Sequence, residues 1–216
     1  MKILNLYACL GGNRYKWGDE HEITAIELDS ELARMYKERF PKDNVIIADA
    51  HQYLLDHYKE FDFVWTSPPC PSHSRIRFGQ VKGRDNDNYK AVYPSMILYE
   101  EILLLENYFE GKFVVENVIP YYEPLIAAQK RGRHLYWTNF TLPNTLSYRE
   151  VSVGSGKDEL NKLCAFHEID LSSYKGEQSK TKIARNLVDF EAGKTILDIA
   201  MGIIRNLNSK QTQLIL

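Results

Sequence analysis

The sequence predicts an α/β fold in which a mostly parallel sheet is covered by helices on both faces. Short segments rich in β-branched and aromatic residues alternate with amphipathic helical segments, which is the order of a parallel sheet with crossover helices. Polar residues follow several of these strands, at the edge of the sheet where α/β proteins bind ligands. Both observations favour one main ligand-binding domain.

Composition narrows the class of protein. The 216 residues are 44% hydrophobic and 26% charged, which suits one sizeable hydrophobic core, and no apolar run approaches the roughly 20 residues that span a bilayer. The amino terminus is interpreted as a strand rather than a secretion signal. Three separated cysteines without CxxC spacing, Cys9, Cys70 and Cys164, favour a reducing compartment and no metal site, so we expect a cytoplasmic protein.

The elements follow in order. Ser30 is placed to cap a helix that Pro41 stops. The predicted strands are Lys2–Ala8, Glu22–Leu28, residues 44–50, Phe61–Ser67, Lys112–Val118 and residues 131–140. The predicted helices are Ser30–Phe40, residues 50–61, residues 94–109 and an amphipathic helix within Ile183–Leu207.

Two segments lack regular periodicity. Residues 72–94 are polar, basic and glycine-containing, which is typical of a long functional loop. Residues 141–180 are rich in turn-forming residues and are interpreted as a small irregular subdomain. The predicted organisation is a catalytic and cofactor-binding domain over residues 1–140, completed by residues 181–216, with residues 141–180 as a target-recognition subdomain.

The stretch TSPPCPSHS, Thr66–Ser74, is the sharpest chemical signal. Two prolines restrict the backbone before Cys70, so the thiol is presented at a defined angle after a strand, although a rigid turn around a passive cysteine is the plain alternative. A thiol attacks as the thiolate, which nearby arginines favour. His73 is a candidate base, but a solvated loop histidine is the more common situation.

Other strand ends carry candidate ligand-binding groups. Glu116 and Asn117 end a strand expected beside that of Cys70, and Glu27 and Asp49 end strands where nucleotide-binding folds take ribose and adenine. Each acidic residue could instead be a solvated or capping strand end. The pair Gly11-Gly12 allows close backbone approach to a ligand, a weak signal without a full GxGxxG.

Together these motifs resemble the cytosine-C5 DNA methyltransferase family. The similar segments are LYACLGG, AIELD, IIADA, SPPC, ENV, QKRGR and ARNLVDFEAGKTIL, in the family's order, with Cys9 where a glycine is usual. The resemblance implies a Rossmann-like methyltransferase fold that uses S-adenosylmethionine. It implies that the catalytic residues are Cys70, Glu116, Arg131 and Arg133. It implies that the cofactor contacts are Tyr7, Leu10, Gly11, Gly12, Glu27, Leu28, Asp49, Ala50, Pro69, Leu98, Asn186 and Val188. The expected substrate contacts are Ser72, Arg75, Arg77, Arg84 and Asn117.

The resemblance also implies a mechanism. The Cys70 thiolate adds to C6 of a flipped cytosine in double-stranded DNA, and the activated C5 takes the methyl group. Glu116 binds the N3 and amino edge of the base, while Arg131 and Arg133 hold its carbonyl and order the catalytic loop. No obligate protein partner is expected.

Three alternatives remain at this point. An amino-group methyltransferase carries a stacking aromatic where this chain has Cys70, and gives no role to ENV or QxRxR. A tRNA C5 methyltransferase uses the same chemistry, but its Cys-Phe-Thr signature is matched poorly by Cys164-Ala165-Phe166. A degenerate nucleic-acid-binding module is the third. Residues 141–180 are few for a recognition domain, which predicts a short target sequence and suits a bacterial or phage restriction-modification context.

Overall fold

The computed structural model describes residues 1–75, 93–151 and 158–203. Most of the predicted loop 72–94, including Arg77 and Arg84, lies outside the described residues, as does the end of the segment Ile183–Leu207. In the described ranges, no helix is long and apolar enough to cross a membrane.

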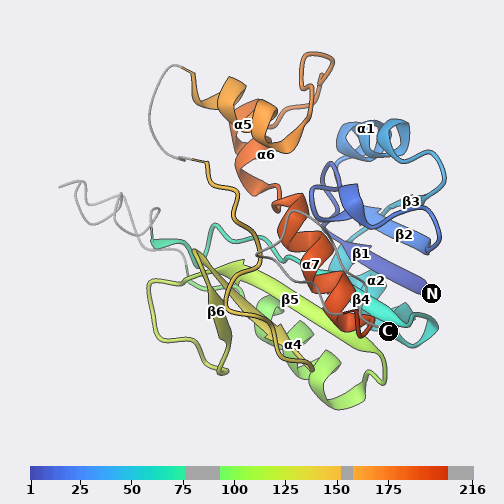
Figure 1. The fold of residues 1–216 in the computed structure, drawn as a ribbon, viewed down its shortest axis with the longest axis vertical. Coiled ribbons are helices and arrows are strands. Elements are labelled where there is room, and N and C mark those ends of the chain that lie inside the picture. The colour runs from blue at the N-terminus through green and yellow to red at the C-terminus, as the bar shows by residue number, and fades with distance from the viewer. Residues whose placement is uncertain (76–92, 152–157, 204–216) are drawn as a thin grey trace.

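One seven-stranded sheet organises the described part of the chain (Figure 1). Its order is β3-β2-β1-β4-β5-β7-β6, and the first five strands are parallel. The parallel strands are β1 (Lys2–Leu6), β2 (Glu22–Glu27), β3 (Asn44–Ile47), β4 (Phe63–Thr66) and β5 (Lys112–Val118). The mostly parallel α/β fold is therefore confirmed, with strands that end one to three residues earlier than most sequence boundaries.

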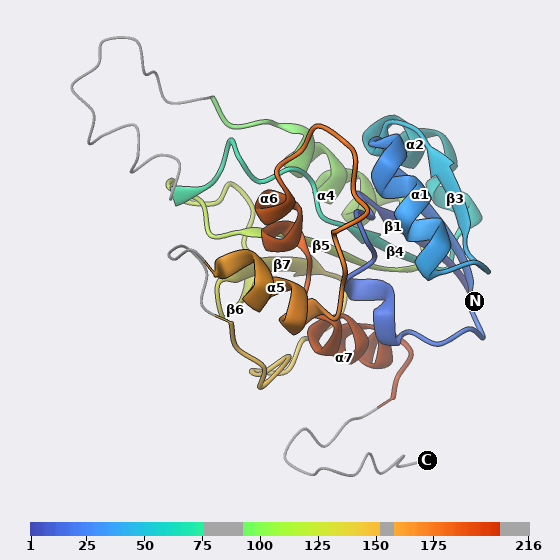
Figure 2. The same ribbon diagram turned by 90° about the horizontal axis from the view of Figure 1, so that it is seen from above.

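Helices cover both faces of the sheet (Figure 2). On one face, α2 (Ala50–His57) and α4 (Ile97–Tyr108) pack on alternate strand residues such as Leu4 and Val64. On the other face, Ile3 packs with α7 (Phe190–Ala200) and with Trp17, which follows the short 3-10 helix η1 (Asn13–Lys16). The helix α1 (Ser30–Arg39) contacts Ala25 of β2, whose side chain faces away from the α2 and α4 layer. A second 3-10 helix, η2 (Tyr58–Glu60), extends α2.

The strand predicted at residues 131–140 is confirmed only over residues 134–138. The structure forms an antiparallel hairpin of β6 (Gln129–Arg131) and β7 (His134–Thr138), and β7 also pairs antiparallel with β5. The turn includes Gly132 at φ 56°, a left-handed conformation that glycine adopts without steric cost. The hairpin closes one edge of the sheet beside the ENV strand.

The amphipathic helix predicted within Ile183–Leu207 is confirmed, and a separate short helix precedes it. The chain forms α6 (Lys180–Asn186), breaks, and begins α7 at Phe190. Asp189 caps α7, because its side chain accepts the Glu191 N–H. Leu187 and Asp189 have extended backbone at this break, and Val188 between them lies against Gly12 in the loop after β1.

Residues 141–180 are less irregular than expected, since they include α5 (Glu159–His167). Leu163 of α5 and Ile183 of α6 share a hydrophobic cluster with Leu10, which follows β1, and with Leu32 of α1. Figure 1 shows α5 and α6 beyond the end of the sheet reached by the carboxyl end of β1. This segment therefore shares part of its core with the predicted cofactor side of the molecule.

Candidate active site

Cys70 follows the carboxyl end of β4, and Glu116 lies near the carboxyl end of the paired strand β5. Thr66 of β4 pairs with Val115 of β5, so Glu116 lies one residue beyond the last matched pair. Asn117 donates from Nδ2 to the Pro68 carbonyl at 2.9 Å, which ties the ENV segment directly to the turn that carries Cys70. The predicted adjacency of these two strands is confirmed.

The Cys70 thiol is a half-buried free cysteine in an environment that favours its protonated form. Burial raises its pKa, and the negative charge of Glu116 raises it further. The charge of Lys182, on α6, opposes this effect and lowers the pKa. Lys182 was absent from the predicted site, because nothing in the sequence indicates that α6 returns near Cys70.

Glu116 itself is buried, with 8% of its surface exposed. Its Oε1 lies 3.5 Å from Nε2 of His134, which belongs to the neighbouring strand β7. Within the described residues, the carboxylate therefore has polar neighbours from β7 and from the Cys70 turn. The Glu116 carboxylate can therefore accept a hydrogen bond from an N–H group of a ring that is bound beside the Cys70 thiol.

The loop after β1 has an unusual backbone. Tyr7 and Cys9 adopt φ angles of 54° and 47°, a left-handed conformation that costs residues with a Cβ about 1–2 kcal/mol. The Cys9 N–H donates to Glu27 Oε2 at 2.8 Å, and burial raises the pKa of the Cys9 thiol to about 12. A glycine would take this conformation freely, so Cys9 is held by its contacts.

The two glycines of this loop serve packing. A Cβ at Gly12 would lie 2.5 Å from the Val188 carbonyl oxygen, and one at Gly11 would lie 2.5 Å from the Phe40 ring. Gly12 thus lets the segment after α6 approach the loop after β1. The predicted cofactor residue Val188 is consequently brought against the first cofactor motif, and Asn186 is close to it in the chain, two residues before.

Glu27 ends β2 with its carboxylate bonded to backbone amides. Its oxygens accept the N–H groups of Cys9 and Asp29, and burial raises its pKa. The next side chain, Leu28, is 68% exposed, which leaves an apolar surface at the strand end. Asp49 is exposed and caps α2 by accepting the Gln52 N–H at 2.8 Å.

Two further predicted cofactor residues lie deeper, and a third does not. Ala50 and Leu98 are buried, at 4% and 2% exposure, whereas Pro69 is exposed. Pro69 and Leu98 line one pocket of about 260 Å³, together with Ser72 and His73 from the Cys70 turn. The pocket joins the predicted cofactor residues to the turn that presents the thiol.

Comparison with known proteins decides the family. A profile of the C-5 cytosine-specific DNA methylase family matches residues 1–120. The chain belongs to this family. No curated protein matches the chain.

The chain is also similar to solved structures of methyltransferases. A methyltransferase from Entamoeba histolytica, EhMeth, superposes with a TM-score of 0.50 and 8% identity, over 94% of this chain and 98% of that one. A variant of Spodoptera frugiperda DNMT2 matches with a TM-score of 0.41 and 20% identity, over 66% of this chain and 51% of that one. The first likeness shows the Rossmann-like methyltransferase fold.

The QxRxR residues of this methylase hold the chain after β7. Arg131 donates to the carbonyl oxygens of Leu142 and Pro143, both at 2.5 Å, and Gln129 donates to Phe140 O at 2.9 Å. Arg133 is exposed in the hairpin turn. Arg131 and Gln129 therefore order residues 140–143, and the expected contacts of Arg131 with the catalytic loop and a base carbonyl stay a prediction.

Two predicted substrate contacts hold the base of the loop after Cys70. The Ser72 hydroxyl accepts the Ser95 N–H at 3.1 Å, which joins the two ends of that loop. Arg75 donates from Nε to the Pro120 carbonyl at 2.7 Å. Both side chains thus have structural partners in this methylase.

His73 is buried, with 1% of its surface exposed, which corrects the expectation of a solvated loop histidine. Its Nδ1 lies 2.5 Å from the Tyr122 hydroxyl, and its Nε2 is buried without a hydrogen-bond partner among the described residues. Burial lowers its pKa, so neutral His73 is favoured. Its role in this state is to pack the Cys70 turn against Tyr122.

Sequence reasoning missed one buried polar centre, Glu101 of α4. Its carboxylate is fully buried and bonds to Tyr7, Thr66 and His51. The hydrogen bond to Glu101 raises the pKa of His51. The sequence does contain a signal for this centre, because Glu101 lies within the otherwise apolar segment ILYEEILLL.

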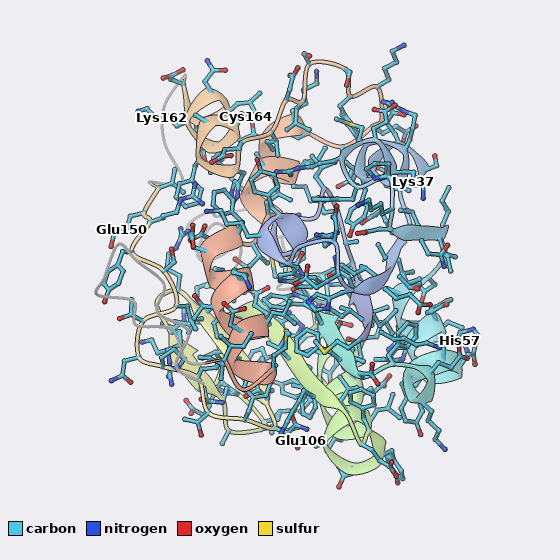
Figure 3. All side chains as sticks on the ribbon, turned by 45° about the vertical axis from the view of Figure 1, so that its right-hand side comes forward. Lys37, His57, Glu106, Glu150, Lys162 and Cys164 are labelled. Atoms are coloured by element: carbon cyan, nitrogen blue, oxygen red, sulfur yellow. The ribbon has the colours of Figure 1, made fainter. Side chains whose placement is uncertain are left out.

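Cys164, labelled in Figure 3, lies on α5 and packs in the cluster that also contains Cys9. All three cysteines lie in described residues and are free thiols. Cys164 packs against apolar side chains of this cluster, so we assign it a packing role.

Proposed function

We propose that this methylase transfers a methyl group from S-adenosylmethionine to C5 of cytosine in double-stranded DNA through a covalent bond between Cys70 and C6 of the base. One observation carries the proposal: the Cys70 turn and the Glu116-Asn117 strand end are joined by the bond from Asn117 to Pro68. A thiol and a carboxylate on neighbouring strand ends can engage two edges of one pyrimidine.

The residues at the sheet edge suit S-adenosylmethionine. Glu27 offers a carboxylate to ribose hydroxyls, the exposed Leu28 offers an apolar surface to adenine, and Asp49 lies at the end of the next strand. Gly12 brings Val188 against the first cofactor loop, where the methionine part would lie. When bound, the cofactor supplies an electrophilic methyl group.

Cys70 and Glu116 act on different edges of the cytosine. The Cys70 thiolate adds to C6, which places electron density on C5, and loss of the C5 proton and of Cys70 later restores the aromatic ring. Glu116 holds the N3 and amino edge, so that negative charge does not accumulate in the ring. Lys182 favours the thiolate, because its positive charge lowers the Cys70 pKa.

The base must leave the duplex to reach these groups. Extrusion costs a few kcal/mol of unstacking, which phosphate contacts must offset. The net charge of −2 gives no general attraction to DNA, so local basic groups are required. Arg75 beside the turn, Arg133 in the hairpin and Lys182 on α6 are the described candidates, and Arg77 and Arg84 complete the predicted set.

A mechanism-based trap tests the proposal. Protein and its Cys70→Ser variant are incubated with S-adenosylmethionine and duplexes that contain 5-fluorocytosine. Fluorine cannot leave C5 as a cation, so the wild-type protein should form a denaturation-resistant adduct and the variant should form none. Adducts on tRNA alone would reassign the substrate to RNA, and no adduct on either nucleic acid would refute the mechanism.

The target sequence is expected to be short. Residues 141–180 offer little surface for base-edge contacts, and several of their apolar residues pack against the cofactor side. Bisulfite sequencing of treated DNA should show methylation at a short or degenerate site. One long invariant site would contradict this expectation.

A further inference from the structure

A single buried carboxylate links three segments of the site. Glu101 of α4 is 0% exposed. Its Oε1 accepts the Tyr7 hydroxyl at 2.7 Å and lies 3.2 Å from Nδ1 of His51, and its Oε2 accepts the Thr66 hydroxyl at 2.6 Å. The three partners are 94, 50 and 35 residues away in sequence.

Each partner stands where a functional segment begins. Tyr7 is the first residue after β1 and has the left-handed backbone from which the first cofactor loop starts. Thr66 is the last residue of β4, immediately before the turn that carries Cys70. His51 lies in the first turn of α2, two residues after Asp49.

A carboxylate has enough acceptor sites to bind Tyr7, His51 and Thr66 at the same time. Two oxygens can accept several hydrogen bonds, whereas a neutral amide in the same place would offer one acceptor and one donor group. Because the site is buried, a hydrogen bond lost here is not replaced by water, and the unpaired group makes the loss costly. Charge-assisted hydrogen bonds of this kind are also the strong ones.

We propose that Glu101 is a positioning residue that sets the cofactor loop through Tyr7 and the Cys70 turn through Thr66. The proposal rests on the proposed function, since it assigns those two segments to cofactor binding and to nucleophile presentation. Because Glu101 is 0% exposed, it would act through Tyr7 and Thr66 and not by contact with the cofactor or the base. It fixes the two loop origins relative to α4, and therefore relative to each other.

The two branches predict separable effects. Tyr7→Phe removes one hydroxyl and should raise the dissociation constant of S-adenosylmethionine about tenfold, with the alkylation rate of Cys70 unchanged. Thr66→Val should change the rate of Cys70 alkylation by iodoacetamide several-fold, with the cofactor dissociation constant unchanged. Glu101→Gln should change both quantities.

Glu100→Gln is the matched control. Glu100 is the exposed neighbour of Glu101 on α4, and its Oε2 approaches His51 Nε2 at 3.2 Å. Among the described residues it makes no hydrogen bond to Tyr7 or Thr66, whose hydroxyls both donate to Glu101, so both quantities should stay at wild-type values.

The experiment uses the full chain, with calorimetric titration of S-adenosylmethionine, peptide-resolved alkylation of Cys70 and a circular dichroism check of folding. A folded Glu101→Gln protein with both quantities unchanged overturns the proposal. So does an equal loss of both quantities in Tyr7→Phe and Thr66→Val, because a general packing role would affect the two loops together. Neither measurement needs nucleic acid. Absence of a 5-fluorocytosine adduct in the wild-type protein would therefore reject the proposed function without deciding the role of Glu101.

Discussion

Replacement of Asn117 by alanine tests how the nucleophile turn is held. The Asn117 side chain is 2% exposed and makes two hydrogen bonds, one from Nδ2 to Pro68 O and one from the Val118 N–H to its own Oδ1, both at 2.9 Å. The first bond crosses from β5 to the Cys70 turn. The second fixes the orientation of the amide.

The expected loss follows from these two bonds. A net hydrogen bond contributes about 0.5–1.5 kcal/mol, and a buried carbonyl left without its donor, here that of the buried Pro68, costs about 1–3 kcal/mol. The free energy of unfolding of Asn117→Ala should therefore fall by about 2–3 kcal/mol. For a chain of this size that is a decrease in Tm of roughly 5–10 °C.

Asn117→Asp separates the hydrogen bond from packing. The aspartate is nearly isosteric, but it places a carboxylate oxygen against the Pro68 carbonyl in place of the N–H donor. Its stability should be lower than that of Asn117→Ala near neutral pH, and should recover partly on acidification, because a protonated carboxyl can donate to Pro68.

Urea denaturation followed by circular dichroism measures the loss, and formation of the 5-fluorocytosine adduct measures the functional effect. Asn107→Ala is the control, since Asn107 is exposed on α4 and donates to Leu103 O at 2.8 Å within its own helix. The control should change stability by less than about 0.5 kcal/mol. An Asn117→Ala protein as stable as the control, with wild-type adduct formation, would refute the reasoning.

Three further predictions concern charge and packing. Glu116→Gln should shift Cys70 alkylation to lower pH, because it removes a negative charge that raises the thiol pKa; an unchanged pH profile would contradict this. Gly12→Ala should cost about 1–3 kcal/mol of stability and weaken binding of S-adenosylmethionine, as its methyl group would lie 2.5 Å from Val188 O, whereas Gly132→Ala, with open space around it, should leave cofactor binding unchanged. Burial and nearby arginine charges lower the pKa of His167 from 6.5 to about 4. The neutral histidine therefore contributes stability above pH 6.5, up to roughly 3 kcal/mol, and this contribution is lost as the pH falls towards 4. His167→Phe should reduce the decrease of the unfolding free energy over this acidic range, measured by urea denaturation.

Local patterns were sufficient to predict the central sheet and the neighbourhood of Cys70. Parallel strands joined by helices must present their carboxyl ends at one edge, so Glu116 could be expected near Cys70 without knowledge of any contact. The pairing of Thr66 with Val115 confirms it. Positions near strand ends can be predicted from the sequence, because the parallel order of the strands alone places their carboxyl ends together.

The partners of particular side chains could not be predicted in this way. Arg131 in a QxRxR motif indicates nothing about whether its guanidinium reaches a base or the carbonyls of Leu142 and Pro143, because that depends on the hairpin that brings residues 140–143 alongside. His73 is similar, since its burial depends on Tyr122, 49 residues later. Both side chains contact residues that are distant in the sequence, which local patterns do not specify.

The packing of α5 and α6 restricts how residues 141–180 can move relative to the loop after β1. Arg39, at the end of α1, donates both to the Leu10 carbonyl and to the carbonyls of His167 and Glu168, which follow one another at the end of α5. Leu10 and Leu163 also belong to one hydrophobic cluster. A segment fastened to the cofactor loop in this way cannot move as an independent recognition domain without disturbing that loop. Sequence discrimination by residues 141–180 and binding of the cofactor are therefore expected to be energetically coupled in this chain.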